Sequence, residues 1–303
     1  MSETTDAPLV SVAIITYNQL DFLKECVASV IAQDYPNIEI VVADDGSTDG
    51  TREFLLQCEK EHARPFILRL NPANHGITAN SNAAHFACSG KYIAWMGGDD
   101  LMLQGKISQQ VEFLEARPDH AICHHELEIF DSVTGNRIVR RRKGNVPRNG
   151  DIETMVRHGT INGASSTMVR ASSTPASGFD IRTPIVSDWM YWIDTLSGGG
   201  KIGYLDQVLG RYRRHGNNVT TIRDSVARIE NIQDDLIACI LVVSKYPWLA
   251  SSALYRCAHL LLEIRFLDLG RHYRDYLKAS LKVHLTAKGL AGLLLERIFR
   301  YRR

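Results

Sequence analysis

Short apolar runs alternate with helical patterns along the first hundred residues. Runs typical of strands buried on both faces occupy residues 10–15, 38–43, 66–70 and 92–96. The segments between them predict helices over residues 18–31, 48–61 and 78–88. Asn18 can cap the first helix, with Asp21 three residues further on. This order predicts an α/β domain with a mainly parallel, Rossmann-like sheet and helices on both faces.

The pattern changes in the middle of the chain and again near residue 220. The middle section predicts helices over residues 104–116 and 187–196, and strands over residues 121–131, 165–170, 202–205 and 208–212. From about residue 221 the apolar positions keep helical spacing, interrupted at Pro247, with a further helix that runs to Leu269. We therefore expect an α/β domain over residues 1–220 and an all-helical region over residues 221–303.

Composition narrows the class of protein. The chain has 303 residues, of which 45% are hydrophobic and 23% charged, and its formal net charge is +1, so the whole molecule is not an electrostatic binder of nucleic acid. No run approaches the roughly 20 apolar residues of a membrane span, and the polar start of the sequence is unlike a signal peptide. Six scattered cysteines without a Cys-x-x-Cys pair favour reduced thiols in a cytoplasmic protein.

Two aspartate pairs follow predicted strands. Asp44-Asp45 comes directly after the run 38–43, and Asp99-Asp100 follows the strand that ends at Met96. The carboxyl ends of parallel strands meet at one edge of a sheet, where α/β proteins bind ligands. One pair can accept the N3–H of a pyrimidine, and the other can hold a divalent metal on a diphosphate. The alternatives are an Asp-Gly turn with Ser47 as a helix cap, and a solvated acidic turn.

Further candidates lie on three other segments. Tyr17, between Thr16 and Asn18, can stack on a nucleobase or simply pack as an aromatic side chain. Asp188 begins a predicted helix, where it can be a functional acid or a common first-turn acid. Arg213 can hold diphosphate oxygens and His215 can complete a metal site, or both belong to a basic surface loop. Residues of the same types are also available at Asp180, Asp194, His124 and His125.

Several common nucleotide and hydrolase motifs are missing from the sequence. No Gly-x-Gly-x-x-Gly follows the first strand, which argues against a dinucleotide oxidoreductase. No phosphate-binding Gly-x-x-x-x-Gly-Lys-Ser/Thr loop and no Gly-x-Ser-x-Gly elbow occur either. The chemical function of this chain is therefore inferred mainly from the two aspartate pairs.

The sequence resembles family 2 glycosyltransferases, of the bacterial polysaccharide and O-antigen type, which have the GT-A fold. The resemblance begins with Val10 to Asn18 and Asp44 to Asp49, and covers roughly residues 9 to 220. Later segments follow in the family's order: Asn74-His75-Gly76, Gly90 to Ala94, Asp99-Asp100, Ser187-Asp188-Trp189 and Tyr212 to His215. Two positions depart from the family: Gly97 stands where many members have an acid, and Ser81-Asn82 stands where many have Arg-Asn. The missing arginine removes one contact to the diphosphate or base.

The resemblance implies a role for each matching residue. Thr16, Tyr17, Asn18 and Asp45 would bind the nucleotide, with Asp44 in support. Asp99 would contact the ribose or diphosphate, and Arg213 the diphosphate. Asp100 and His215 would hold Mn²⁺ or Mg²⁺. Asp188 would be the catalytic base.

These roles define an inverting, metal-dependent glycosyltransferase of the hexosyltransferase type. It would move a sugar from a UDP- or dTDP-linked donor to a hydroxyl of a glycan or lipid-linked glycan. Two alternatives are a nucleotidyltransferase, and a nucleotide-sugar-binding assembly subunit that has lost turnover. The sequence names neither the sugar, nor the acceptor, nor the linkage.

Two basic segments remain outside this interpretation. Residues 286–303 combine an apolar side with Lys288 and several arginines, which fits either a packed terminal helix or a peripheral helix on the inner face of the cell membrane. The same apolar residues can instead pair with a second copy of the chain. Residues 137–148 contain six basic residues and no acid, as in a solvated hairpin or an acceptor-side loop.

Overall fold

The computed structural model describes residues 7–140, 149–159, 163–216, 218, 225–263 and 273–300. Its first third alternates strands and helices as expected. The strands are β1 (Val10–Thr16), β2 (Ile38–Asp44), β3 (Phe66–Leu70) and β4 (Tyr92–Gly97). The helices are α1 (Leu20–Ile31), α2 (Thr51–Glu61) and α3 (Ile77–His85).

The parallel strands bring their carboxyl ends to one edge. β1 lies between β2 and β4, and β3 pairs with β2, all in parallel. In this register Thr16 lies opposite Asp44, and Ile15 lies opposite Gly97. The residues at the ends of β2 and β4, including both aspartate pairs, therefore leave the sheet at the same edge, on either side of β1.

The middle of the chain extends this sheet. Its strands are β5 (Leu101–Met102), β6 (His120–Asp131), β7 (Arg137–Arg140), β8 (Thr167–Arg170) and β9 (Lys201–Arg214). Its helical elements are α4 (Lys106–Glu115), α5 (Ile152–His158), η1 (Ala164–Ser166), η2 (Ala171–Ser173) and α6 (Ser187–Leu196). The sheet order is β3-β2-β1-β4-β8-β6-β9-β5, with β7 beside β6.

The α/β class is confirmed, and the details of the middle section differ from the sequence expectation. Antiparallel pairing of β8 with both β4 and β6 makes the sheet mixed. The two short strands expected over residues 202–212 form one long strand, β9, because register shifts beside β6 absorb the irregularity. The strand expected from Ser165 begins as the 3₁₀ turn η1.

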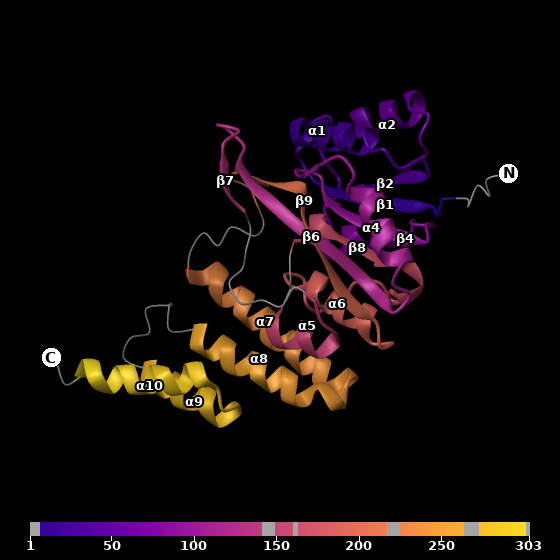
Figure 1. Cartoon of the computed structure of the whole chain (residues 1–303). Helices are drawn as coiled ribbons and strands as arrows, with labels where there is room; N and C mark the ends of the chain where they lie inside the picture. The colour runs from indigo at the N-terminus through magenta and orange to yellow at the C-terminus, as the bar shows by residue number, and fades with distance from the viewer. Residues whose placement is uncertain are drawn as a thin grey trace.

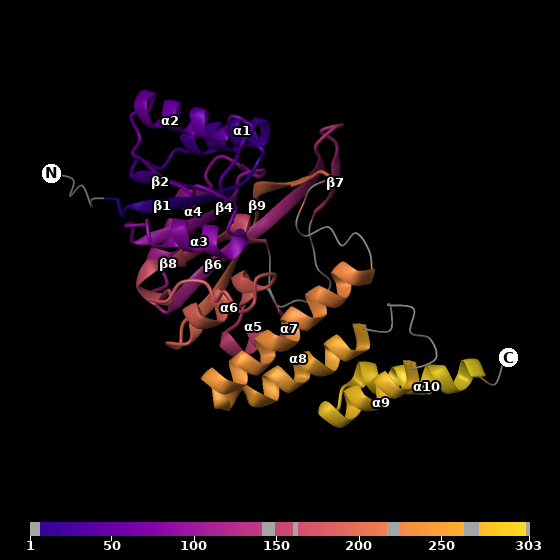
Figure 2. The ribbon, with the colours of Figure 1, turned by 180° about the vertical axis from the view of Figure 1, so that it is seen from behind.

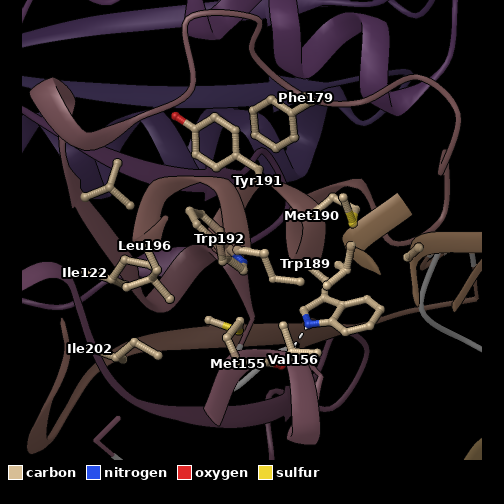
Figure 3. Close-up of a cluster of buried hydrophobic side chains, with 14 of the residues drawn as sticks. Ile122, Met155, Val156, Phe179, Trp189, Met190, Tyr191, Trp192, Leu196 and Ile202 are labelled. Atoms are coloured by element: carbon tan, nitrogen blue, oxygen red, sulfur yellow. Dashed lines mark hydrogen bonds between the residues drawn. The ribbon is translucent and has the colours of Figure 1, made fainter. Parts of the chain in front are cut away.

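Alternate side chains of the strands pack into two hydrophobic cores, one on each face of the sheet. Val12 and Ile14 face α1, α2 and α4, whereas Ala13 and Trp95 face α3 and α6. Figure 3 shows the second core around α6, where Trp189 and Trp192 are buried. The Trp189 indole Nε1 donates to the carbonyl of Met155 in α5 over 2.9 Å. Helix α6 is therefore fixed on both sides.

The carboxyl-terminal region is helical in the described residues. It contains α7 (Ser225–Lys245), η3 (Pro247–Leu249), α8 (Ala250–Glu263), α9 (Tyr273–Val283) and α10 (Ala287–Arg300). Figures 1 and 2 show this layer beside α5 and α6, away from α1 and α2. The expected boundary near residue 220 and the expected helix end at Leu269 lie outside the described residues. No described helix combines the length and hydropathy needed to cross a membrane.

The predicted cap of α1 is wrong. Helix α1 begins at Leu20, and the residue at its N-cap, Gln19, makes no side-chain capping bond. The Asn18 side-chain oxygen instead accepts the backbone N–H of Thr48 over 2.8 Å. Asp49 takes the place of the cap, because its carboxylate accepts the N–H of Leu20 over 2.9 Å. Hydrogen bonds thus connect the loops that follow β1 and β2.

Candidate active site

The loop after β2 is tied to the start of α3 by the carboxylate of Asp45. Its Oδ1 accepts the side-chain amide of Asn71 and the N–H of His75, each over 3.0 Å, and its Oδ2 accepts the N–H of Gly76 over 2.9 Å. Gly46 has a φ of 78°, and a Cβ there would lie 2.7 Å from the backbone of Ala73. Glycine is therefore required where the two loops approach.

The rest of the β1–β2 edge forms a compact hydrogen-bonded unit. The buried Asp44 carboxylate accepts both the N–H and the hydroxyl of Ser47, so Ser47 serves this turn rather than a helix end. Burial raises the pKa of Asp44, and the bonds from Ser47 oppose that shift. Thr16 is buried, and its carbonyl accepts the N–H of Asp45 over 3.1 Å. Tyr17 is 46% exposed at the same edge, which leaves its ring accessible to a ligand.

The Asp99-Asp100 turn follows β4, at the same edge of the sheet as the loop after β2. Asp100 is 2% exposed, and its Oδ1 accepts the N–H of Arg213 over 2.9 Å. Its Oδ2 accepts the hydroxyl of Ser165 in η1. Burial, and then the charge of Asp99, raise the pKa of Asp100. A positive charge at this turn would stabilise its carboxylate form.

His215 and Asp99 form the more accessible half of this cluster. The His215 Nε2 lies 2.9 Å from Asp99 Oδ2, and the Asn218 amide donates to the same oxygen over 3.3 Å. The imidazole also packs on Phe22, with 4.9 Å between ring centroids. The structure therefore brings His215, at the end of β9, to the turn after β4.

Arg213 is buried beside the same turn. Its Nε donates to the Asp99 carbonyl over 2.7 Å, and its terminal nitrogen pairs with Glu25 over 2.6 Å. The guanidinium lies 4.6 Å from the Phe22 ring centroid and 4.7 Å from that of Phe130. These contacts fix Arg213 next to the backbone of Asp99, where it supplies positive charge.

Asp188 lies half-buried in the first turn of α6. Its neighbour Ser187 accepts a hydrogen bond over 3.2 Å from the hydroxyl of Thr78, which belongs to the first turn of α3. The loop that leads into α3 is the one that Asp45 holds through Gly76. The segments that carry Asp45 and Asp188 therefore both contact the start of α3.

The other acids and histidines considered from the sequence have structural partners or lie in the core. Asp180 pairs with Arg182 over 2.6 Å. Asp194 pairs with Lys245 over 2.7 Å and accepts the hydroxyl of Tyr246 at the same distance. The remaining two candidates are buried in β6, at His124 and His125.

The donor set at the Asp99-Asp100 turn suits a hard divalent ion. Carboxylates favour Mg²⁺ and Mn²⁺, which commonly use one or two protein carboxylates together with substrate phosphates. Each carboxylate oxygen of Asp100 has accepting capacity beyond its single hydrogen bond. No group of three or more candidate ligands is preassembled among the described residues. The residues present therefore fit a site that the diphosphate helps to complete.

Three residues of the site region escaped the sequence analysis. Ser165 holds Asp100, and the fully buried Lys106 holds Ser165, with burial lowering the pKa of Lys106 to about 7. Asp234 of α7 accepts the N–H groups of Ile185 and Val186, each over 2.8 Å, just before α6. Only Lys106 had a signal, since it shares a helical face with Gln110 and Leu114.

Sequence comparison assigns the chain to a class of enzyme. The model for glycosyl transferase family 2 matches residues 11–171, which is more than half of the chain. The protein therefore belongs to family 2 and is a glycosyltransferase.

Two relatives illustrate this membership. The chain is 28% identical to the putative teichuronic acid biosynthesis glycosyltransferase TuaG of Bacillus subtilis, over 73% of this chain and 85% of that protein. It is 34% identical to the putative glycosyltransferase EpsE of the same organism, over 55% of this chain and 58% of that protein.

Solved structures share the fold. TarS 1-349 of S. aureus in complex with UDP-GlcNAc superposes with a TM-score of 0.67 at 14% identity, covering 93% of this chain and 83% of that one. The mannosyltransferase PcManGT of Pyrobaculum calidifontis, in complex with GDP-Man and Mn²⁺, gives a TM-score of 0.64 at 18% identity, covering 97% and 81%. The GT-A-like architecture is thus shared across most of the chain.

Proposed function

We propose that this glycosyltransferase moves a sugar from a UDP- or dTDP-linked donor to a hydroxyl of a glycan or lipid-linked glycan, with inversion at the anomeric carbon. The observation that carries the proposal is the placement of Asp45, Asp100 and Asp188. The first two follow β2 and β4, the parallel strands on either side of β1, and the segments that carry Asp45 and Asp188 both contact the start of α3. The family membership of the chain removes the nucleotidyltransferase alternative.

The donor lies along the edge formed by β1, β2 and β4. Tyr17 covers the base, and Asp45 recognises it, held in place by amide donors of the loop before α3. Asp99 contacts the ribose or diphosphate, and the buried Arg213 adds positive charge beside that turn. A structural neighbour was crystallised in complex with UDP-GlcNAc, which supports a nucleotide-sugar donor.

Asp100 and His215 would hold Mn²⁺ or Mg²⁺, and Asp99 is in contact with His215. When bound, the ion offsets the charge that builds up on the leaving diphosphate. The neighbour crystallised with Mn²⁺ supports divalent metal use in this fold. Burial raises the pKa of Asp100, and a cation bound beside it would stabilise its carboxylate form.

Asp188 accepts the proton of the attacking hydroxyl. As the acceptor oxygen forms its bond to the anomeric carbon, the bond from that carbon to the diphosphate oxygen breaks, and the proton passes to the Asp188 carboxylate. The base must face the carbon from the side opposite the leaving group. Asp188 lies on α6, a segment separate from the Asp99-Asp100 turn, and this separation supports the role of base. The name of the relative TuaG, which refers to teichuronic acid, supports a glycan acceptor.

A thermal-shift screen tests the donor class and the metal together, because a ligand that binds the native state raises its melting temperature. UDP-, dTDP- and GDP-sugars are compared with and without Mn²⁺. We expect a UDP- or dTDP-sugar to give the largest shift, and only with Mn²⁺. A larger shift with a GDP-sugar, or none that depends on metal, contradicts the proposal. Release of the nucleoside diphosphate with a hydroxyl acceptor then separates an enzyme from an inactive binding subunit.

A further inference from the structure

Lys106 occupies an unusual position behind the Asp99-Asp100 turn. It is the first residue of α4, and its side chain is completely buried. A cation at a helix amino terminus meets the positive end of the helix dipole, and burial deprives it of hydration. Apolar side chains such as Ile107 and Leu114 fill the same buried face without these costs. The presence of a lysine at position 106 therefore needs an explanation, which the contacts of its amino group provide.

The amino group of Lys106 holds the backbone of η1. Its Nζ donates to the Ser165 carbonyl over 2.8 Å and lies 3.5 Å from the sulfur of Met96 in β4. An amine donates in either protonation state, so this contact does not depend on the charge of Lys106. Lys106 therefore connects α4 to the short turn that carries Ser165.

The hydroxyl of Ser165 continues this connection to Asp100. It accepts the N–H of Gly97, at the end of β4, over 3.0 Å, and it donates to Asp100 Oδ2. A Cβ on Gly97 would lie 3.7 Å from this hydroxyl and 2.7 Å from Asp99 Oδ1, so the crowded turn has little room for another side chain. One hydroxyl thus sets the orientation of Asp100 relative to β4.

We propose that Lys106 is a positioning residue for Asp100, which it orients through the carbonyl and hydroxyl of Ser165 so that the carboxylate faces the cation of the donor complex. This inference rests on the proposed function, because it takes Asp100 as a ligand of that cation. Removal of a residue that orients a metal-ligating side chain typically changes the metal affinity by about 10–100-fold. Lys106 and Ser165 should have effects of this size.

Gln110 provides a matched control on the same helix. It lies one turn after Lys106, is equally buried, and also holds η1, since its amide donates to the Ser166 carbonyl over 3.0 Å and to the Cys123 carbonyl over 3.1 Å. The hydroxyl of Ser166 points away from this path, because it donates to the Gly163 carbonyl over 2.8 Å. Loss of Gln110 therefore loosens η1 without cutting the path from Lys106 to Asp100.

The test measures the affinity of the full-length chain for Mn²⁺ by calorimetry at saturating UDP. We expect Lys106→Met and Ser165→Ala each to weaken Mn²⁺ binding by about 10–100-fold, and Gln110→Met by less than about threefold. Because both changes cut one path, the double variant should lose less than the product of the two single losses. Equal effects of Lys106→Met and Gln110→Met, or independent effects in the double variant, overturn the inference.

Two further measurements distinguish a positioning role of Lys106 from misfolding and from failure of the proposed metal site. If Lys106→Met does not fold, Ser165→Ala decides alone, because it retains the Lys106 contact to the backbone carbonyl and removes only the hydroxyl bridge; unchanged Mn²⁺ affinity then rejects the inference. Asp100→Ala tests the proposed function itself. Unchanged Mn²⁺ affinity in Asp100→Ala removes the metal site, whereas a loss there without a loss in Ser165→Ala rejects only the role of Lys106 and Ser165.

Discussion

The carboxylates on the two sides of the site are held in different ways. Asp100 is almost fully buried, and hydrogen bonds from Ser165 and Arg213 reach its oxygens directly. Asp188 is half-buried on the first turn of α6, where its Oδ1 accepts the N–H of Trp189 over 2.7 Å, and Asp234 braces the backbone before that helix. A group that carries a cation gains from a fixed orientation, whereas a group that meets an incoming hydroxyl must stay accessible. The difference therefore matches the two proposed roles.

The largest expected effect is on the accessible side. Asp188→Asn removes the proton acceptor but keeps the shape of the side chain, so turnover should fall by about 10²–10⁴-fold while donor affinity stays within about twofold. Initial rates and donor titration measure the two quantities. Asp180→Asn is the control, because Asp180 pairs with Arg182 and should matter little to turnover. Near-normal turnover in Asp188→Asn would remove Asp188 from the role of base.

On the buried side, the expected loss is in metal-dependent binding. Asp100→Ala should weaken donor binding in the presence of Mn²⁺ by more than about tenfold, and donor binding in EDTA should change much less. Calorimetric titration of UDP with and without Mn²⁺ measures both. An equal loss under the two conditions would mean that Asp100 supports the fold of the turn rather than the metal.

A smaller effect should follow from loosening the brace behind α6. Asp234→Ala leaves the N–H groups of Ile185 and Val186 without their acceptor, which should lower the free energy of unfolding by about 1–3 kcal/mol. Turnover should fall less than in Asp188→Asn. Glu230→Ala, an exposed change on the same helix, should stay within about 0.5 kcal/mol. Denaturant unfolding measures both variants, and equal stabilities would show that the brace is unimportant.

The smallest expected effect concerns the basic carboxyl-terminal helix. We propose that residues 286–303 add peripheral contact with an anionic membrane surface, worth about 1 kcal/mol for each lysine or arginine near the surface. Co-sedimentation with anionic vesicles should decrease when these residues are deleted, and neutral vesicles should show little binding in either case. Equal sedimentation of the two proteins on anionic vesicles would reject the anchor.

The sequence predicted the arrangement of β1, β2 and β4 well because its signals are local. Apolar runs located β1, β2 and β4, and the aspartates that follow them could be placed at one edge by the geometry of parallel strands alone. The brace of α6 could not be predicted in this way. Asp234 acts on residues 48 and 49 positions away, and nothing in its own neighbourhood distinguishes it from an ordinary surface acid.

Two other features were not predicted correctly: the residue that caps α1 and the burial of Lys106. Asn18 and Asp49 are both good acceptors for a helix start, and tertiary contact between the β1 and β2 loops decided that Asp49 serves α1. Lys106 shares a helical face with Leu114, but a lysine in a helix pattern usually indicates a solvated position, so its burial was not expected. Its contact with Ser165 joins residues 59 positions apart. Such contacts become visible only when the fold brings the segments together.

The central claim is that acidic side chains from β2, β4 and α6 surround one nucleotide diphosphate and its cation. A crystal structure of the chain with UDP and Mn²⁺, with the anomalous signal of manganese recorded, tests it most directly. The account predicts a manganese peak in contact with Asp100, the base beside Asp45, and Asp188 facing the open end of the diphosphate. Manganese bound away from the turn after β4, or UDP bound on another face, would contradict it.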